Sequence, residues 1–256
     1  MTPSANIKEI ASLVEDANRI LSITGAGISA DSGLPTYRGV GGLYSQELTE
    51  EGFSIETALS HRMFLERPAI SWKYIAQIEQ TCRGKKPNTG HCFFAELEKS
   101  GKQVCILTQN VDGFHHQAGS TNVIDIHGHI YDIVCSHCRF RCRVGSYSEL
   151  DIPPYCPRCR KILRPDVVLF DEMLPVAKPA RLEKELEKGF DLVFSIGTTS
   201  FFPYIAQPVI AAAKNGIPTV EINPDRTAIS PIVRIKIDGK AAETLRKVED
   251  QWKEKH

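Results

Sequence analysis

The sequence contains no long apolar run, no excess of one sign of charge and no internal repeat. No stretch approaches the roughly 18 apolar residues of a transmembrane span, and the amino-terminal segment lacks the apolar core of a signal peptide. The 31 basic and 31 acidic residues balance, so nothing draws the whole chain to nucleic acid or to an anionic membrane. We therefore expect a cytoplasmic protein without a membrane partner, and we do not expect nucleic-acid binding.

Cysteine, by contrast, is present in number. Eight cysteines without a secretion signal indicate a reducing compartment and metal ligation rather than disulfides. Cys135-x-x-Cys138 and Cys156-x-x-Cys159 are separated by 17 residues, a spacing typical of a four-cysteine zinc ribbon. Four thiolates close the coordination sphere, so the zinc is expected to be structural. The spacing of Cys142 fits neither pair.

Short apolar runs alternate with amphipathic stretches along most of the chain. We predict strands over 20–24, 103–108, 123–126, 191–196, 219–222 and 232–237, and helices over 7–19, 89–100, 204–214 and 241–255. Such alternation is typical of an α/β fold with a doubly wound parallel sheet, which we describe as Rossmann-like.

Two stretches break this alternation and are expected to form a smaller inserted domain. We assign 1–35, 89–130 and 166–256 to the Rossmann-like domain. Residues 36–88, a loop followed by short helical patterns, and 131–165, which contain both cysteine pairs, would form the small domain.

A glycine-rich turn follows the first predicted strand. Gly25-Ala26-Gly27-x-x-Ala30 fits the G-x-G-x-x-G/A pattern, in which glycines let the backbone approach a pyrophosphate. The acidic residue that a dehydrogenase places about 20 residues later is missing. A polar loop over 31–39 follows instead and could close over a nucleotide, which argues against hydride transfer.

Polar side chains also follow the next two strands. Gln109, Asn110 and Asp112 end one, and His127 ends the other. Carboxyl ends of parallel strands share one crevice, and an imidazole is well suited to act as a base there. The alternative is that these residues only cap and turn the chain.

Further polar or small groups end the later strands. Gly197-Thr198-Thr199 and Asn223 would suit hydrogen bonds to ribose or phosphate, although each could be a plain loop with a helix cap. Val167, Val168 and Phe170 are typical of an exposed edge strand beside the ribbon, to which an extended peptide could add.

Together these motifs resemble the sirtuins, the NAD-dependent protein lysine deacylases. The matching motifs are GAGIS with SGLPTYRG, TQNVD, HGH, two CxxC pairs, RPDVVLFDE, GTT and INP, in the family's order from about Leu21 to Gly239. The lack of long extensions is typical of a bacterial or archaeal member. The family's fold agrees with the one predicted from the chain itself.

The resemblance implies NAD and structural zinc as bound groups and acylated-lysine proteins as substrates. NAD would contact Gly25, Ala26, Gly27, Asp31, Tyr37, Arg38, Gln109, Asn110, Asp112, His127, Gly197, Thr198, Thr199, Asn223, Lys240 and Ala241. The substrate would contact Val167, Val168, Phe170, Ile75 and Ile78. Cys135, Cys138, Cys156 and Cys159 would hold the zinc.

The implied reaction releases nicotinamide, O-acyl-ADP-ribose and free lysine. His127 would act as the base, assisted by Asn110 and Asp112, rather than His115, His116 or His129. Family members that remove acidic acyl groups carry a Tyr-x-x-Arg pair, for which Tyr74-x-x-Gln77 is the nearest approach. The hypothesis is therefore a deacetylase, with longer apolar acyl groups as further candidates.

Two features remain open at this stage. Asp171 stands where the family usually has glycine, which adds a carboxylate near the peptide cleft. Protein mono-ADP-ribosyl transfer at the same NAD site and a non-catalytic NAD-binding module remain the alternative functions. We expect a monomer.

Overall fold

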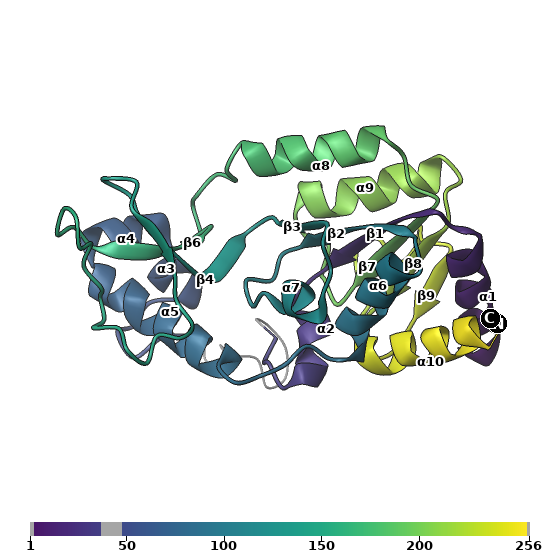
Figure 1. The fold of residues 1–256 in the computed structure, drawn as a ribbon, viewed down its shortest axis with the longest axis horizontal. Helices are drawn as coiled ribbons and strands as arrows, with labels where there is room; N and C mark the ends of the chain where they lie inside the picture. Colours follow the sequence, from purple (N-terminus) through teal and green to yellow (C-terminus); the bar gives the residue numbers. More distant parts are fainter. Residues whose placement is uncertain (1–2, 37–47, 255–256) are drawn as a thin grey trace.

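The computed structural model describes residues 3–36 and 48–254, and its largest element is a six-stranded parallel sheet (Figure 1). The strands lie in the order β3-β2-β1-β7-β8-β9. Their bounds are β1 (Arg19–Thr24), β2 (Gln103–Thr108), β3 (Val123–Asp125), β7 (Leu192–Ile196), β8 (Thr219–Ile222) and β9 (Ile235–Ile237). The chain builds outward from β1 on one side and from β7 on the other, which is doubly wound topology.

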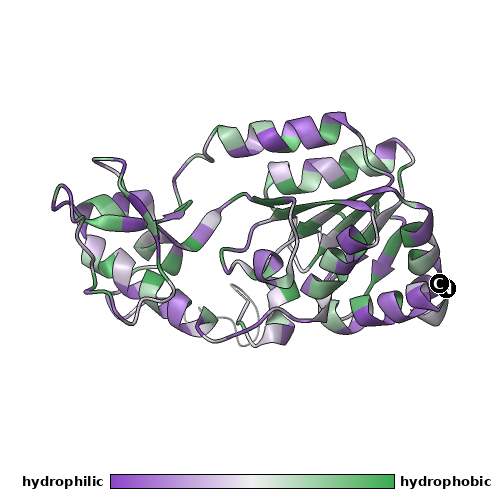
Figure 2. Cartoon of the chain, viewed as in Figure 1, coloured by the Kyte–Doolittle hydropathy of each residue, from purple (hydrophilic) through white to green (hydrophobic). Residues whose placement is uncertain are grey.

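Helices cover both faces of this sheet. One face packs on α1 (Pro3–Asp16), α6 (Thr89–Lys99) and α10 (Ala241–Lys253), and the other on α8 (Ala177–Glu187) and α9 (Pro203–Lys214). Ile20 of β1 belongs to the first core and its neighbour Leu21 to the second, because successive strand residues point to opposite faces. Figure 2 shows the strands as largely hydrophobic and α8 and α10 as rich in hydrophilic residues.

A smaller lobe lies at one end of the molecule (Figure 1). It contains a three-stranded antiparallel sheet in the order β5-β4-β6, formed by β4 (Gly128–Cys135), β5 (Arg141–Arg143) and β6 (Leu163–Val167). Helices α3 (Ile55–Ala58), α4 (His61–Glu66) and α5 (Pro68–Cys82) complete it. Trp72 joins the two parts, since its indole N–H donates to the carbonyl of Leu163 at 2.8 Å and its ring meets Tyr147 edge-on.

Short helices follow the first two strands of the large sheet. α2 (Ala26–Ser29) and the 3₁₀ helix η1 (Ala30–Ser32) follow β1, and α7 (Phe114–Ala118) follows the loop after β2. Across the two described stretches of chain, no helix has the length and apolar content needed to cross a membrane.

The predicted fold class is confirmed, and most boundaries differ by few residues. β2 and β8 have the predicted bounds, whereas α8 was not predicted and the 131–165 stretch contains more strand than expected. The predicted edge strand is confirmed in part: β6 lies at an edge of the three-stranded sheet but ends at Val167, and Phe170 pairs instead through its backbone with Leu59 and His61. The domain boundaries stay a prediction.

Candidate active site

Three glycines bring the loops after β1 and β7 into direct contact. The Gly27 amide donates to the carbonyl of Gly197 at 2.9 Å, and a Cβ on Gly27 would lie 2.5 Å from the Gly197 Cα. A Cβ on Gly25 would lie 2.7 Å from the same carbonyl oxygen. The strand order reverses between β1 and β7, and nucleotide ligands of doubly wound sheets bind in the crevice at that point. The glycines are therefore required for the packing of the two loops at the crevice.

The loop after β2 extends across the same crevice. Gln109 Nε2 donates to the Thr198 hydroxyl at 2.7 Å, which links the ends of β2 and β7. Asn110 Nδ2 donates to the carbonyl of Gly25 at 3.1 Å. The structure thus brings together residues that the sequence separates by up to 173 positions, from Gly25 to Thr198.

Asp112 belongs to this loop and is almost fully buried. Burial raises the pKa of its carboxyl, while hydrogen bonds from the Phe114 amide and the Ser29 hydroxyl oppose the rise. Ser29 also lies 3.3 Å from Nε2 of His91, a fully buried histidine on α6. Sequence reasoning assigned no role to Ser29, although it lies in the glycine motif, and nothing in the sequence marked His91.

The ends of β7 and β8 and the start of α10 form the far side of the crevice. Asn223 Nδ2 donates to the carbonyl of Thr198 at 2.9 Å. Asp31 accepts from the Ala242 amide at 3.1 Å and lies 3.9 Å from Nζ of Lys240. Lys240 is largely exposed and Ala241 is buried. Thr199, in the loop after β7, is exposed.

His127 lies between β3 and β4, at the end of the large sheet that faces the small lobe. Nδ1 lies 3.0 Å from the carbonyl oxygen of Gln109, and Nε2 lies 2.8 Å from the hydroxyl of Tyr204. Burial lowers the pKa of His127 to about 4, although the contact with Gln109 acts in the opposite direction. The imidazole is therefore neutral at neutral pH and able to accept a proton. Sequence reasoning did not single out Tyr204.

The other three histidines of this segment have different surroundings. His115 is buried against the Thr24 hydroxyl at 3.0 Å, and burial lowers its pKa well below the usual value. His116 is partly exposed and pairs with Asp125 at 2.7 Å, which raises its pKa. His129 accepts from the Tyr131 amide at 3.2 Å.

The predicted substrate residues fall into two groups. Val167 pairs with Gly128 in the small sheet, and the Val168 amide donates to the carbonyl of His127 at 2.8 Å. This contact places the edge of the small sheet directly beside the histidine. Ile75 and Ile78, in contrast, are buried in the core of the small lobe, and their contact with a substrate stays a prediction.

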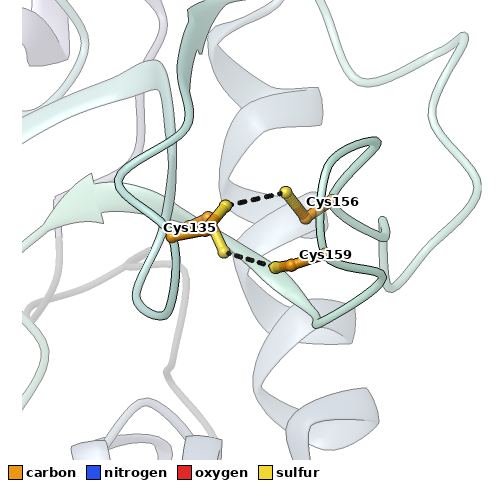
Figure 3. Close-up of side chains that lie close together, drawn as sticks. Cys135, Cys156 and Cys159 are labelled. Carbon is orange, nitrogen blue, oxygen red and sulfur yellow. Dashed lines mark hydrogen bonds between the residues drawn. The ribbon is translucent and has the colours of Figure 1, made fainter.

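The four cysteines of the two CxxC pairs form one cluster in the small lobe. Their sulfur atoms all lie within 4.8 Å of one another, with Cys135–Cys159 at 3.5 Å and Cys138–Cys156 at 3.4 Å (Figure 3). Tetrahedral zinc with bonds of about 2.3 Å to sulfur requires sulfur separations of about 3.8 Å. The donor set and its spacing therefore fit Zn²⁺. Cys142, on β5, lies outside the cluster.

Two predicted cofactor residues cannot be placed. Tyr37 and Arg38 lie outside the described residues.

The fold and the site together define a class: an α/β protein with a Rossmann-type crevice, a histidine at its edge and a four-cysteine cluster in a second lobe. The chain belongs to the Sir2 family, whose family model matches residues 25–202. It is 46% identical to NAD-dependent protein deacylase 2 of Pseudomonas aeruginosa, over 97% of this chain and 98% of the relative. It is 35% identical to NAD-dependent protein deacylase 1 of Archaeoglobus fulgidus, over 93% of this chain and 94% of the relative.

Solved structures agree. A Sir2 homologue in complex with NAD superimposes with a TM-score of 0.86 at 33% identity, over 96% of this chain and 94% of that one. A complex of Sir2 with a p53 peptide and NAD superimposes with a TM-score of 0.81 at 27% identity, over 96% of this chain and 98% of that one. The sirtuin resemblance of the sequence is thereby confirmed.

Proposed function

We propose that this protein is an NAD-dependent protein lysine deacylase that yields free lysine, nicotinamide and O-acyl-ADP-ribose. The observation that carries the proposal is the position of His127. Its side chain ends at the crevice edge, and its carbonyl accepts from Val168 of the segment after β6. A nucleotide in the crevice and a peptide along the small sheet would therefore meet at one neutral imidazole.

The crevice fits the NAD that the related structures contain. The glycine loop packs on Gly197 without a Cβ at Gly27. Its backbone amides, at the start of α2, would bind the pyrophosphate. Asn110 and Asp112 are held rigidly by Gly25 and Ser29, which suits them to fix the nicotinamide end. Asn223 would hold the adenosine ribose, and Lys240 and Ala241 would border the adenine.

His127 supplies the base. Because its pKa is lowered to about 4 by burial, the imidazole is available to take a proton from a ribose hydroxyl throughout the neutral range. That removal lets the ribose oxygen attack the carbon of the transferred acyl group. Water then completes the release of lysine.

The acyl group is proposed to be apolar. Gln77 carries no charge that could pair with an acidic acyl group, and the hydroxyl of Tyr74 is already bonded to the carboxylate of Glu51. The negative charge of Glu51 beside Tyr74 would repel the carboxylate of an acidic acyl group. Acetyl-lysine should therefore turn over faster than succinyl-lysine, and the reverse order would refute this specificity.

The test is product analysis by mass spectrometry. An acetyl-lysine peptide is incubated with the protein, with and without NAD, and the masses and amounts of the peptide and nucleotide products are measured. Equal amounts of deacetylated peptide and O-acetyl-ADP-ribose, formed only with NAD, are expected. ADP-ribosylated peptide without deacetylation would establish mono-ADP-ribosyl transfer instead. If the peptide stays intact whichever acyl group it carries, the remaining function is that of an NAD-binding module. The monomeric state, the cytoplasmic location and the protein substrates stay predictions.

A further inference from the structure

Both nitrogens of the His127 ring already have partners in this structure. Nδ1 lies 3.0 Å from the carbonyl oxygen of Gln109 and Nε2 lies 2.8 Å from the hydroxyl oxygen of Tyr204. A carbonyl oxygen can only accept, so the neutral imidazole carries its proton on Nδ1. Nε2 then holds the lone pair, and the Tyr204 hydroxyl is the donor. The basic nitrogen of His127 is therefore covered by a phenol.

The position of Tyr204 is fixed by its own surroundings. It lies in the first turn of α9, directly after Pro203, whose ring suits the first position of a helix. Its ring stacks on Phe202 with centroids 5.3 Å apart and planes 11° from parallel. Phe202 in turn meets the His127 ring edge-on at 6.0 Å. Phe202 thus contacts the rings of both Tyr204 and His127 and helps to hold the hydroxyl against Nε2.

The hydroxyl is also in the right protonation state to donate. Burial raises the pKa of Tyr204 to about 12, so the phenol keeps its proton at neutral pH. The charged group that acts on His127 from α8 is Lys178, which disfavours the imidazolium form. Its ammonium donates to the carbonyl of Asp125 at 2.6 Å and does not contact the imidazole nitrogens.

We propose that Tyr204 and His127 form one proton-accepting pair, in which the Tyr204 hydroxyl relays the ribose proton to Nε2 of His127. The ribose O–H bond breaks and its proton binds the Tyr204 oxygen, while the proton of Tyr204 moves to Nε2. The electron pair left on the ribose oxygen forms the new bond to the acyl carbon, and the π pair of that carbon's double bond to the lysine nitrogen moves onto the nitrogen. Tyr204 is neutral before and after the step, and His127 becomes an imidazolium. This inference rests on the proposed deacylase function.

The first test uses the NAD-free wild-type protein. Nitrogen-15 NMR of labelled histidine reports which ring nitrogen of His127 carries the proton. The pair requires a proton on Nδ1 and a hydrogen-bonded, unprotonated Nε2. A proton on Nε2 would overturn the proposal, and this outcome depends neither on a variant that must fold nor on turnover.

The second test is the variant Tyr204→Phe, which removes the hydroxyl and keeps the ring that stacks on Phe202. The hydrogen bond to Nε2 exists only with neutral imidazole, so its loss should raise the pKa of His127 and move the acid limb of the rate profile upward. The kcat for deacylation should fall at least about tenfold, since general base catalysis typically contributes about 10²–10⁴-fold. Exchange of labelled nicotinamide takes place before the step in which the base accepts a proton. Its rate should therefore stay within about threefold of the wild-type rate.

The control is Tyr155→Phe, which removes a hydroxyl from an exposed tyrosine of the small lobe and should leave every rate unchanged. An unchanged kcat in Tyr204→Phe would overturn the relay. An equal loss of exchange and deacylation would also overturn it, because it would assign Tyr204 to folding or to NAD binding. If wild type itself shows no NAD-dependent deacylation, the proposed function fails, whereas the NMR result still decides whether the pair exists.

Discussion

The hydroxyl of Ser29 donates a hydrogen bond to Oδ2 of Asp112 at 2.7 Å and thereby joins the loop after β1 to the loop after β2. Both residues are almost fully buried. Asn110 Nδ2 donates to the same hydroxyl at 3.1 Å. One serine therefore satisfies the buried carboxyl group of Asp112 and orients the amide of Asn110, both of which are proposed to act in catalysis with His127.

Replacement of Ser29 by alanine should weaken both stability and activity. A buried acceptor that loses its donor costs about 1–3 kcal/mol, so the free energy of unfolding should fall by that amount in urea titrations. The rate of nicotinamide release should fall as well. Ser22→Ala is a matched control, because the Ser22 hydroxyl is equally buried and has no hydrogen-bond partner within the described residues. Similar losses in both variants would contradict the role given to Ser29.

Gly27→Ala tests the contact between the loops after β1 and β7. The new Cβ would lie 2.5 Å from the Gly197 Cα, and the neighbour is backbone that cannot move aside easily. Such overpacking costs about 1–3 kcal/mol or more, and the displaced loop should bind NAD weakly by calorimetry.

Gly145→Ala adds the same atom in open space and serves as the control for Gly27→Ala. Wild-type NAD affinity and wild-type stability in Gly27→Ala would contradict this role of Gly27.

The large sheet could be predicted because its strands are buried on both faces. β2 contains four consecutive apolar residues, Val104 to Leu107, and all four residues of β8 are buried. α8 was missed because Leu182 is its single fully buried residue, so it carries almost no apolar stripe. β4 was missed because Gly128 begins it at φ +95° and an irregularity between His129 and Ile133 breaks its alternation.

Zinc removal should unfold the small lobe before the large sheet. One zinc per chain is expected by elemental analysis, because four thiolates converge within 4.8 Å. Cys159→Ser should lose the metal and lower the thermal midpoint. Cys142→Ser alters a thiol outside the cluster and should keep both the zinc and the wild-type thermal midpoint. Full metal content in Cys159→Ser would exclude this ligand set.

Acid should destabilise the protein through its buried histidines. Burial lowers the pKa of His91 to about 3, of His127 to about 4 and of His115 well below its usual value. As pH falls below about 6.5, the unfolded chain binds protons that the folded chain does not, so the free energy of unfolding falls. Each histidine contributes up to about 1.4 kcal/mol per pH unit.

Urea titrations between pH 7 and pH 4 measure this slope. His115→Gln should reduce it by up to about 1.4 kcal/mol per pH unit, because one proton uptake disappears. His116→Gln is the control, since bonding to Asp125 raises the pKa of His116 and its loss should not reduce the slope. Equal slopes in wild type and His115→Gln would show that His115 is protonated in the folded state.

The site was only partly visible in the sequence for a physical reason. Gln109 to His127 could be placed together because parallel strands end at one edge. Tyr204 lies 77 residues from His127 in a stretch predicted only as a helix, and no local pattern encodes a contact of that range. His91 likewise contacts Ser29 only after α6 packs against the loop that follows β1.

The most direct measurement is the NAD-dependent deacetylation of an acetyl-lysine peptide by wild type, His127→Ala and His116→Ala. His116 lies on α7, partly exposed, and its loss should leave the rate unchanged. Wild type and His116→Ala should form deacetylated peptide and O-acetyl-ADP-ribose, and His127→Ala should form neither. Deacetylation by His127→Ala at the wild-type rate would contradict the account, because no base would then be needed at the place where the two lobes meet.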